Sequence, residues 1–527
     1  MGNCASKPPL SLIGFVKLHN FASVLRRWWL RDVDLSLALL FWTAGMILIA
    51  LISFPNHYTF RTDALDLGYV LAMIEYVMKG HFFVSVYGWD IPHFTHLMYI
   101  TAIPFYLVGK AWGVLVHQWL SMGLGAWGLY MFAKRKLSKG APWVLVHFFG
   151  MWGVHGAMGY DAHPELLGLC MIPWIFYAID ANKPYLFIIS WIFLTFSKEQ
   201  HIIMSFFLLF GLWYLYRKSP FPKKFLWFAL GISTLCMILS VLMVAWLESK
   251  YKVQSIPNML YRHLWSDNPF NPTSYAEGFF QKIKQLIKNA RYLWPMLWES
   301  QIPDPDLRGI KSEVHLSVLL TGGWTFFAYP IFAFMLLPTY IYKMYANSAN
   351  RWSILAHYNM EFAIIIPIAV VWFMSHRGRR YAGWGMPVIA IFTQIYNHVL
   401  FRNTFAFFVS PERQYWYDCI HYYNPLYDYE AITSALKQIP DTATVSATNR
   451  LNPHLTRDPR LLYWFPDVRG HHNRPAQYIA LLREDGFTPP LDREAYNAYI
   501  DSLTHSPAWE VIHDKDYLLI LKSRPPD

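Results

Sequence analysis

The chain has 527 residues, of which 55% are hydrophobic, 18% are aromatic and only 15% are charged. Soluble proteins carry about a quarter of their residues as charges, so this composition excludes a soluble chain and indicates a membrane protein with many spans. The net charge of +11 does not indicate nucleic-acid binding, because the basic residues lie in short clusters between apolar runs. We therefore expect no nucleic-acid partner.

Basic residues precede the first membrane-length apolar run, which covers residues 34–54. Positive residues favour the cytoplasmic side of a membrane. We therefore predict a cytoplasmic segment over residues 1–33 and an outer position for the chain after the run. Further apolar runs recur as far as residue 400, and they predict a transmembrane module, residues 34–400, with about 11 or 12 spans.

Two stretches of this module are too polar to cross lipid, and we predict outer loops over residues 55–92 and 248–312. The apolar run over residues 92–108 is short, and a crossing there would place the next basic cluster outside. We therefore favour a re-entrant or interfacial segment. A later run, residues 316–345, contains Pro330 and predicts two short spans that turn at this proline.

The C-terminal residues, 401–527, have dispersed Asp, Arg, Asn and Pro in place of long apolar runs. They predict a soluble extracytoplasmic domain of α/β type. The elements expected in it are a helix over residues 428–438, strands over 443–447, 461–464 and 477–482, and a hairpin over 509–521 that turns at 513–516. The predicted fold class is mainly α: a polytopic helical membrane protein with a small α/β C-terminal domain.

Acidic residues open the first outer loop. Asp63 and Asp66 stand at the start of an apolar segment, residues 64–78, with Gly80 as its stop signal. Such a segment would rest at the outer interface and hold its carboxylates near the membrane surface. They are candidates for a general base or metal ligands. The alternative is that they are helix-start acids favoured by the helix dipole.

A second polar group is Asp161-Ala-His-Pro-Glu165, at a helix start where proline suits the first turn. Asp161, His163 and Glu165 together could bind a divalent metal or an acceptor substrate. The alternative is that Asp161 caps the helix and Glu165 adds a favourable first-turn charge.

Lys198 and Glu199 lie between two apolar runs, where charges are costly unless they are paired, hydrated or functional. Lys198 could neutralise an anionic group such as a lipid phosphate, with Glu199 orienting it. The alternative is that the two residues pair with each other at a turn.

Arg351 and His357 stand near the outer end of a late span and could also meet a phosphate. The alternative for Arg351 is a side chain that reaches toward the interface beside Trp352. His357 could instead pair with Glu361, one helical turn further on.

Under the predicted topology these side chains all gather at the outer membrane face, which favours an interfacial active site. A secondary transporter would place its polar groups near the midplane, on interrupted helices of repeated halves. No repeated halves, Walker loop, dinucleotide fingerprint or HExxH motif is visible.

In order along the chain, a set of short motifs resembles a family of bacterial and archaeal polytopic membrane proteins with a domain of unknown function. The similarity extends over nearly the whole chain and includes Val445 to Leu455. The other motifs that carry it are Asp66-Leu-Gly68, Gly80, His93-Phe-Thr-His96, Asp161-Ala-His-Pro-Glu165, Lys198-Glu199, Pro330, His357-Tyr358 and Leu461-Leu-Tyr-Trp-Phe465.

That family resembles the GT-C glycosyltransferases. The resemblance implies many spans, a catalytic acid in the first outer loop, a polyprenyl-phosphate sugar as donor substrate and, in some members, a divalent metal. By motif position Asp66 matches the catalytic carboxylate, and Asp63 is a neighbour that could substitute. GT-C enzymes often have adjacent acids at this point, whereas Ala64 and Leu65 separate the two acids of this chain.

The resemblance also implies partners and a location. The remaining candidates would bind substrate: Asp161, His163, Glu165, Lys198, Glu199, Arg351 and His357. We expect membrane lipid and a lipid-linked sugar as partners, in the cell inner membrane, with the active face and the C-terminal domain extracytoplasmic. The alternatives are a transporter or lipid flippase without glycosyl transfer, or a noncatalytic scaffold that presents the C-terminal domain. The sequence predicts neither the donor sugar nor the acceptor.

Overall fold

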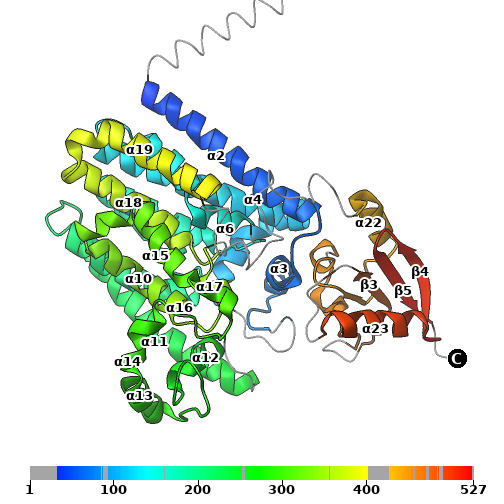
Figure 1. Cartoon of the computed structure of the whole chain (residues 1–527). Coiled ribbons are helices and arrows are strands. Elements are labelled where there is room, and N and C mark those ends of the chain that lie inside the picture. Colours follow the sequence, from blue (N-terminus) through cyan, green and yellow to red (C-terminus); the bar gives the residue numbers. More distant parts are fainter. Residues whose placement is uncertain are drawn as a thin grey trace, which may run out of the picture.

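A helical module and a smaller domain that contains a sheet make up the protein (Figure 1). The computed structural model describes residues 32–524, except for 85, 87–92, 160, 252–255, 355–356, 401–426, 456, 470–473, 484 and 486–490. Most of the predicted cytoplasmic segment, residues 1–31, and the predicted start of the C-terminal domain at residue 401 lie outside the described residues.

The helical module packs its helices side by side, with the long helix α2 along its upper edge in Figure 1. Its main helices are α2 (Val33–Tyr58), α3 (Tyr69–Met78), α4 (His96–Lys136), α5 (Trp143–Gly150), α6 (Trp152–Gly159), α7 (Leu166–Cys170), α8 (Ile172–Asp180), α9 (Pro184–Thr195), α10 (Glu199–Leu215), α11 (Lys223–Tyr251), α15 (Ile310–Leu320), α16 (Ile331–Met344), α17 (Ala349–Trp352), α18 (Met360–His376) and α19 (Ala382–Ile395).

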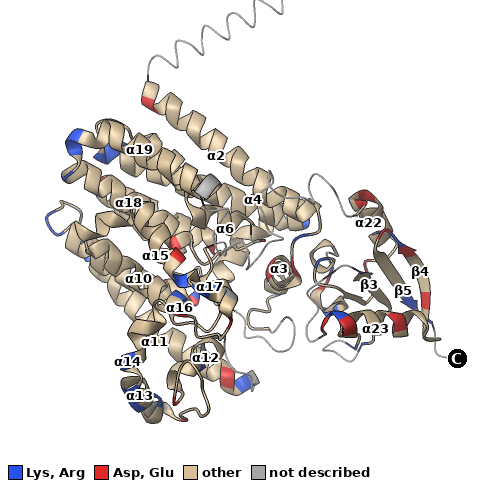
Figure 2. Cartoon of the chain, in the orientation of Figure 1, with Lys and Arg blue, Asp and Glu red and all other residues tan. Residues whose placement is uncertain are grey.

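Apolar side chains cover the outside of this module. On α11 the large side chains of Leu235, Val241 and Leu242 are half or more exposed, which is stable only where lipid surrounds the helix. Figure 2 shows the long helices almost free of charge along their length, with basic residues at the α18–α19 turn. This pattern is that of a protein embedded in a membrane.

Fewer helices than predicted are long enough to cross a membrane alone. Among the described residues three are long and apolar enough, or four if the pair α18–α19, bent by 104°, is one span. The other apolar runs form shorter helices, because turns interrupt them: residues 143–159 are divided into α5 and α6, and residues 316–345 turn just before α16 at Pro330, as predicted. The predicted outer loop over residues 248–312 contains short helices: α12 (Ile256–Tyr261), α13 (Phe279–Lys288) and α14 (Ala290–Met296).

Helix α18 is the centre of the module. Its residues from Met360 to Trp372 are all buried, so other parts of the protein rather than lipid surround this stretch. It contacts α4, α5, α6, α7 and α16. The helices α6 and α7, which flank Asp161, therefore pack against the centre of the module.

Helix α4 is a hairpin of two helical arms, because Lys110 has non-helical angles (φ 50°, ψ −125°). Thr101 on the first arm lies 3.2 Å from Nε2 of His117 on the second, although a straight helix would separate these residues by about 24 Å. The first arm, residues 96–109, is about 21 Å long and too short for a hydrocarbon core of roughly 30 Å. This agrees with the predicted re-entrant or interfacial segment.

The hairpin depends on a glycine, and we predict that Gly113→Ala destabilises the protein by about 1–3 kcal/mol. A Cβ at this position would lie 1.9 Å from the carbonyl oxygen of Phe105, so the arms must separate. Thermal unfolding in detergent checks this, with Gly231→Ala on α11 as the matched control, because nothing lies within 4 Å of a Cβ there. Equal melting temperatures for the two variants would contradict the close approach.

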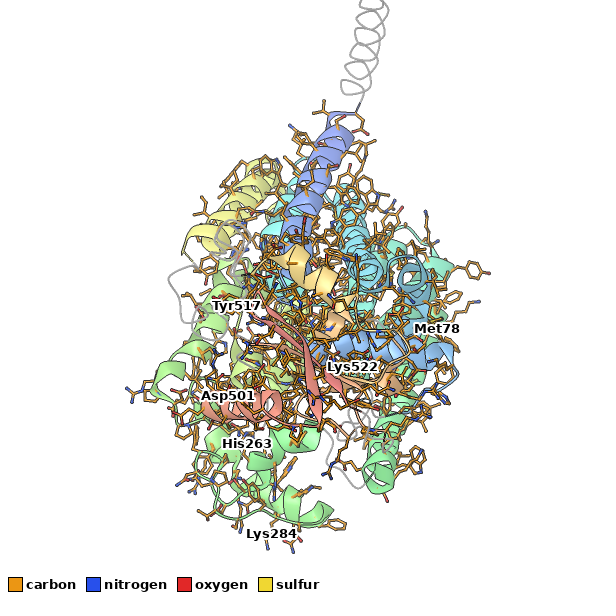
Figure 3. All side chains as sticks on the ribbon, turned by 90° about the vertical axis from the view of Figure 1, so that its right-hand side faces the viewer. Met78, His263, Lys284, Asp501, Tyr517 and Lys522 are labelled. Atoms are coloured by element: carbon orange, nitrogen blue, oxygen red, sulfur yellow. The ribbon has the colours of Figure 1, made fainter. Side chains whose placement is uncertain are left out.

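The C-terminal domain contains a five-stranded sheet with the order β2-β1-β3-β5-β4. Strand β1 pairs in parallel with β2 and β3, whereas β5 pairs antiparallel with β3 and β4. Figure 3 faces this domain, with Lys522 on β5 and Asp501 on helix α23 labelled. Its elements are α22 (Tyr429–Leu436), β1 (Val445–Ala447), β2 (Leu462–Trp464), β3 (Tyr478–Leu482), α23 (Arg493–Thr504), β4 (Trp509–Lys515) and β5 (Leu518–Ser523).

Two helices cover the two faces of this sheet, because alternate residues of a strand point to opposite sides. On β3, Ala480 packs in the cluster that contains α22, whereas Ile479 packs in the cluster that contains α23. The predicted α/β type and all five strand regions are confirmed. The hairpin turns at Asp516 and Tyr517, both with positive φ, slightly later than predicted. Helix α23 was not predicted.

Candidate active site

Three carboxylates meet between the helical module and the C-terminal domain. Asp63 precedes a short π-helix, η1 (Ala64–Gly68), which carries Asp66 and leads into α3. Asp161 lies in the turn between α6 and α7, and its Oδ2 accepts a 2.5 Å hydrogen bond from the backbone N–H of Asp63. Oxygen atoms of the three carboxylates all lie within 4.8 Å of one another. The structure thus joins two motifs that are about 100 positions apart.

Asp161 has a positive φ of 49°, which is uncommon for a residue other than glycine and costs free energy unless the surroundings enforce it. Gln118 on α4 holds this turn: its Nε2 donates to the carbonyl oxygen of Asp161 (2.9 Å), and its Oε1 accepts from the backbone N–H of His163 (2.5 Å). Asn56 at the end of α2 donates to the carbonyl oxygen of Gly159 (3.1 Å). The second arm of α4 and the end of α2 therefore fix Asp161.

The environment disfavours full ionisation of these carboxylates. Burial, followed by the negative charge of Asp66, raises the pKa of Asp161 well above its usual value. Burial also raises the pKa of Asp66, although the charges of His163 and Lys198 oppose the shift. Carboxylates this close repel one another unless a proton or a cation neutralises part of their charge.

A buried ion pair lies next to this carboxylate cluster. Nζ of Lys198 donates to Oε1 of Glu165 at 2.7 Å, and the two side chains are only 9% and 11% exposed. Burial would raise the pKa of Glu165, but Lys198 and His163 lower it to about 2. Burial would likewise lower the pKa of Lys198, but Glu165 and Glu199 raise it. Both partners therefore remain charged, and Lys198 places a positive charge close to Asp66.

Stacked aromatic rings lie next to the ion pair of Lys198 and Glu165. The ring of His163 stacks on that of His357 with centroids 3.7 Å apart, and His357 lies against Tyr358 at 3.8 Å. The guanidinium of Arg351 lies 4.5 Å from the ring centres of both Tyr342 and Tyr358. Within the described part of the chain, no carboxylate forms an ion pair with Arg351. Arg351 is therefore a half-buried cation that is held by aromatic rings.

Glu199 belongs to a neighbouring pair. Its Oε1 lies 2.6 Å from Nδ1 of His93, and its Oε2 accepts from the backbone N–H of Phe94 at 3.3 Å. The alternative in which Lys198 and Glu199 pair with each other is thus wrong, because each has its own partner. Two adjacent residues point in different directions, so they reach different neighbours.

Glu361, which the sequence suggested as a partner of His357, lies close to His201. Its Oε1 lies 3.8 Å from Nε2 of His201, whose Nδ1 lies 2.7 Å from Oγ of Ser197. This group extends the polar region toward the core helix α18.

All nine predicted site residues therefore lie in one connected region. Asp63, Asp66 and Asp161 form the carboxylate cluster. Of the other six, Lys198 pairs with Glu165, His163 stacks on His357, Arg351 reaches this stack through Tyr358, and Glu199 follows Lys198 in the chain. Their roles remain predictions. Sequence reasoning missed Gln118 and His93 as site residues. Gln118 had a readable signal, since it is a polar residue within an apolar run.

The carboxylate cluster suits a hard divalent cation such as Mg²⁺ or Mn²⁺. These ions prefer oxygen ligands, and Mg²⁺ is commonly held by one or two carboxylates together with substrate phosphates. The three carboxylates offer oxygen atoms within 4.8 Å of one another. A cation would also relieve the repulsion between Asp66 and Asp161.

Comparison with known proteins gave one family and one solved structure. The crystal structure of ArnT from Cupriavidus metallidurans bound to undecaprenyl phosphate is similar to this chain at 10% sequence identity and a TM-score of 0.45, over 93% of this chain and 97% of that one. No curated protein matches the sequence. Residues 56–519 match the family described as predicted membrane protein DUF2079. This match confirms the resemblance to a family of membrane proteins with a domain of unknown function. Because it covers most of the chain, the protein belongs to the DUF2079 family.

Proposed function

We propose that this protein is an integral membrane glycosyltransferase of the GT-C type, which moves a sugar from a polyprenyl-phosphate donor to an acceptor at the outer face of the cell inner membrane. The observation that carries the proposal is the juxtaposition of three carboxylates, Asp63, Asp66 and Asp161, with the buried cation Lys198. A second cation, Arg351, lies in the same polar region. Sugar transfer from a lipid phosphate needs a base on one side of the sugar and positive charge on the other.

Asp66 is the proposed base. It would accept the proton of an acceptor hydroxyl as the oxygen attacks the anomeric carbon of the sugar. The bond between that carbon and the phosphate oxygen breaks, and the polyprenyl phosphate leaves with the bonding electrons. The position of Asp66 on a short π-helix, η1, supports this role, because π-helical turns often occur at functional sites.

Lys198 and Arg351 are the proposed binding groups for the departing phosphate. Glu165 holds Lys198 charged and in place at 2.7 Å, so the cation needs little rearrangement when negative charge develops. Arg351 is fixed between Tyr342 and Tyr358. Arginine can bind phosphate through two parallel hydrogen bonds, which also orients the donor.

A divalent cation would be held by Asp63, Asp66 and Asp161. When bound, it would supply positive charge that neutralises the cluster and stabilises the phosphate. We predict that Mn²⁺ binds the purified protein and that Asp161→Asn weakens binding at least about tenfold, because one anionic ligand is lost. Electron paramagnetic resonance of Mn²⁺ measures the affinity.

The matched control for this prediction is Asp514→Asn, which removes a carboxylate of strand β4 that pairs with Arg483 at 2.9 Å. This variant should bind Mn²⁺ as the unaltered protein does. Equal Mn²⁺ affinities for Asp161→Asn and the unaltered protein would exclude Asp161 as a ligand.

The proposed activity is tested with purified protein in lipid nanodiscs and a panel of polyprenyl-phosphate hexoses labelled with ¹⁴C in the sugar. Transfer or hydrolysis should move the ¹⁴C label from the lipid to the acceptor or to free sugar, and chromatography separates these products from the donor. Coupled flux of the lipid in proteoliposomes without cleavage of any donor would favour the flippase alternative and reject the transferase.

A further inference from the structure

We infer that the C-terminal domain is part of the active site, and that Asn449 of this domain is a positioning residue for the carboxylate cluster. The reaction that it would serve is the proposed transfer, so this role rests on the proposed function. The contacts themselves can be tested whatever the reaction is.

Asn449 makes three hydrogen bonds to the segment that carries the carboxylates. Its backbone oxygen and its side-chain Oδ1 both accept from the backbone N–H of Ala64 at 3.0 Å. Its Nδ2 donates to Oδ1 of Asp63 at 2.9 Å, across 386 positions of sequence. Asn449 is only 2% exposed. It comes two residues after β1, at the carboxyl end of a strand with parallel neighbours, where binding sites commonly form in α/β sheets.

These bonds constrain Asp63 from two sides. Its backbone N–H is bound to Asp161 of the helical module, whereas its side chain is bound to Asn449 of the C-terminal domain. A neutral amide can orient a carboxylate without adding charge to a cluster that is already strongly negative. An aspartate at position 449 would keep an acceptor for Ala64 but would repel Asp63.

Phe60 anchors the same segment in the C-terminal domain. Its side chain is 1% exposed and belongs to the hydrophobic cluster of that domain, together with Leu451. Its ring lies 4.0 Å from that of His454. Phe60 also has a positive φ of 55°, which a bulky residue adopts only where packing enforces it. The segment just before Asp63 therefore belongs to the core of the other domain.

The rest of η1 and α3 also lies against this domain, in agreement with their proximity in Figure 1. A Cβ on Gly68 would lie only 2.6 Å from Oδ1 of Asn452, so the two chains approach closely. At the far end of α3, Lys79 pairs with Asp458 at 2.9 Å. The C-terminal domain thus contacts the chain from Phe60 to Lys79. Within this contact, Asn449 binds the side chain of Asp63, which belongs to the carboxylate cluster.

Three full-length variants in nanodiscs test the inference: Asn449→Ala, Asn449→Asp and the control Lys79→Met. The control removes a docking ion pair but leaves the contacts of Asn449 intact. Hydrogen–deuterium exchange of residues 61–68 reports the docking, and kcat and KM for a donor that the unaltered protein turns over report the positioning. Thermal unfolding verifies that each variant is folded.

Asn449→Ala should raise amide exchange in residues 61–68 about tenfold, because the side-chain acceptor for Ala64 and the donor to Asp63 are both lost. Asn449→Asp keeps the acceptor but repels Asp63, so the exchange should rise less than in Asn449→Ala. Both should lower kcat about tenfold with little change in KM, because the carboxylate is misplaced while donor binding is kept. Lys79→Met should change neither the exchange of this segment nor kcat.

Unaltered exchange in Asn449→Ala would overturn the inference, as would an unaltered kcat in both Asn449 variants. Were the protein to cleave no donor at all, the proposed function would fail, and the exchange measurement would still decide whether Asn449 holds Asp63 and Ala64. If Asn449→Ala does not fold, the kcat of a folded Asn449→Asp variant still tests the inference.

Discussion

Replacement of Asp66 by asparagine should lower the rate of sugar transfer by roughly 10²–10⁴-fold, the usual contribution of a general base. The amide has nearly the same size as the carboxylate, so the fold should be retained, but it cannot accept the proton of the acceptor hydroxyl. The proposed phosphate ligands Lys198 and Arg351 are unchanged in this variant, so the loss should appear mainly in kcat. The measurement is kcat and KM with a labelled polyprenyl-phosphate sugar.

The neighbouring Asp63 provides the control, since sequence reasoning left it as a possible substitute. Its side chain is bound to Asn449 at 2.9 Å, whereas no hydrogen bond to a described residue engages the carboxylate of Asp66. Asp63→Asn should therefore cause the smaller loss. A double variant, Asp63→Asn with Asp66→Asn, that transfers sugar at the original rate would remove both residues from the mechanism.

Replacement of Lys198 by methionine should destabilise the protein by about 3–5 kcal/mol, because it leaves the buried carboxylate of Glu165 without its partner. The two side chains are 9% and 11% exposed and 2.7 Å apart. The variant should also bind polyprenyl phosphate more weakly, since Lys198 is a proposed phosphate ligand. Thermal unfolding in detergent gives the first quantity and lipid binding gives the second.

A double-mutant cycle separates the two effects. Glu165→Gln combined with Lys198→Met removes both charges, so it should recover much of the lost stability. It should not recover the affinity for polyprenyl phosphate, because the cation is still absent. Recovery of both quantities together would show that Lys198 has only a structural role.

The helical module was readable from the sequence because long apolar runs with basic clusters leave few alternatives in a membrane. The position of Asp63 and Asp66 was also readable from the sequence: they stand at the start of an apolar segment with Gly80 as its stop signal, and η1 with α3 covers this segment. The division of the longer apolar runs into short helices could not be predicted from the sequence, since it depends on packing around α18.

The contact partners of the site residues were harder to predict from the sequence than their positions along the chain. Lys198 and Glu199 are adjacent, and only the fold reveals that one faces Glu165 and the other His93. The contact of Asn449 with Asp63 joins residues 386 positions apart, and no local pattern indicates such a distance. Helix α23, in contrast, was missed although Asp492 caps it and Tyr496, Ile500 and Leu503 recur at helical spacing on its buried side.

The most direct test of a single site for lipid phosphate and carboxylate chemistry is a cryo-electron-microscopy structure in nanodiscs with undecaprenyl phosphate and Mn²⁺. The phosphate should lie within hydrogen-bond distance of Lys198 or Arg351, with Mn²⁺ among Asp63, Asp66 and Asp161. A lipid phosphate bound away from these cations, or a metal bound away from the three carboxylates, would contradict the account.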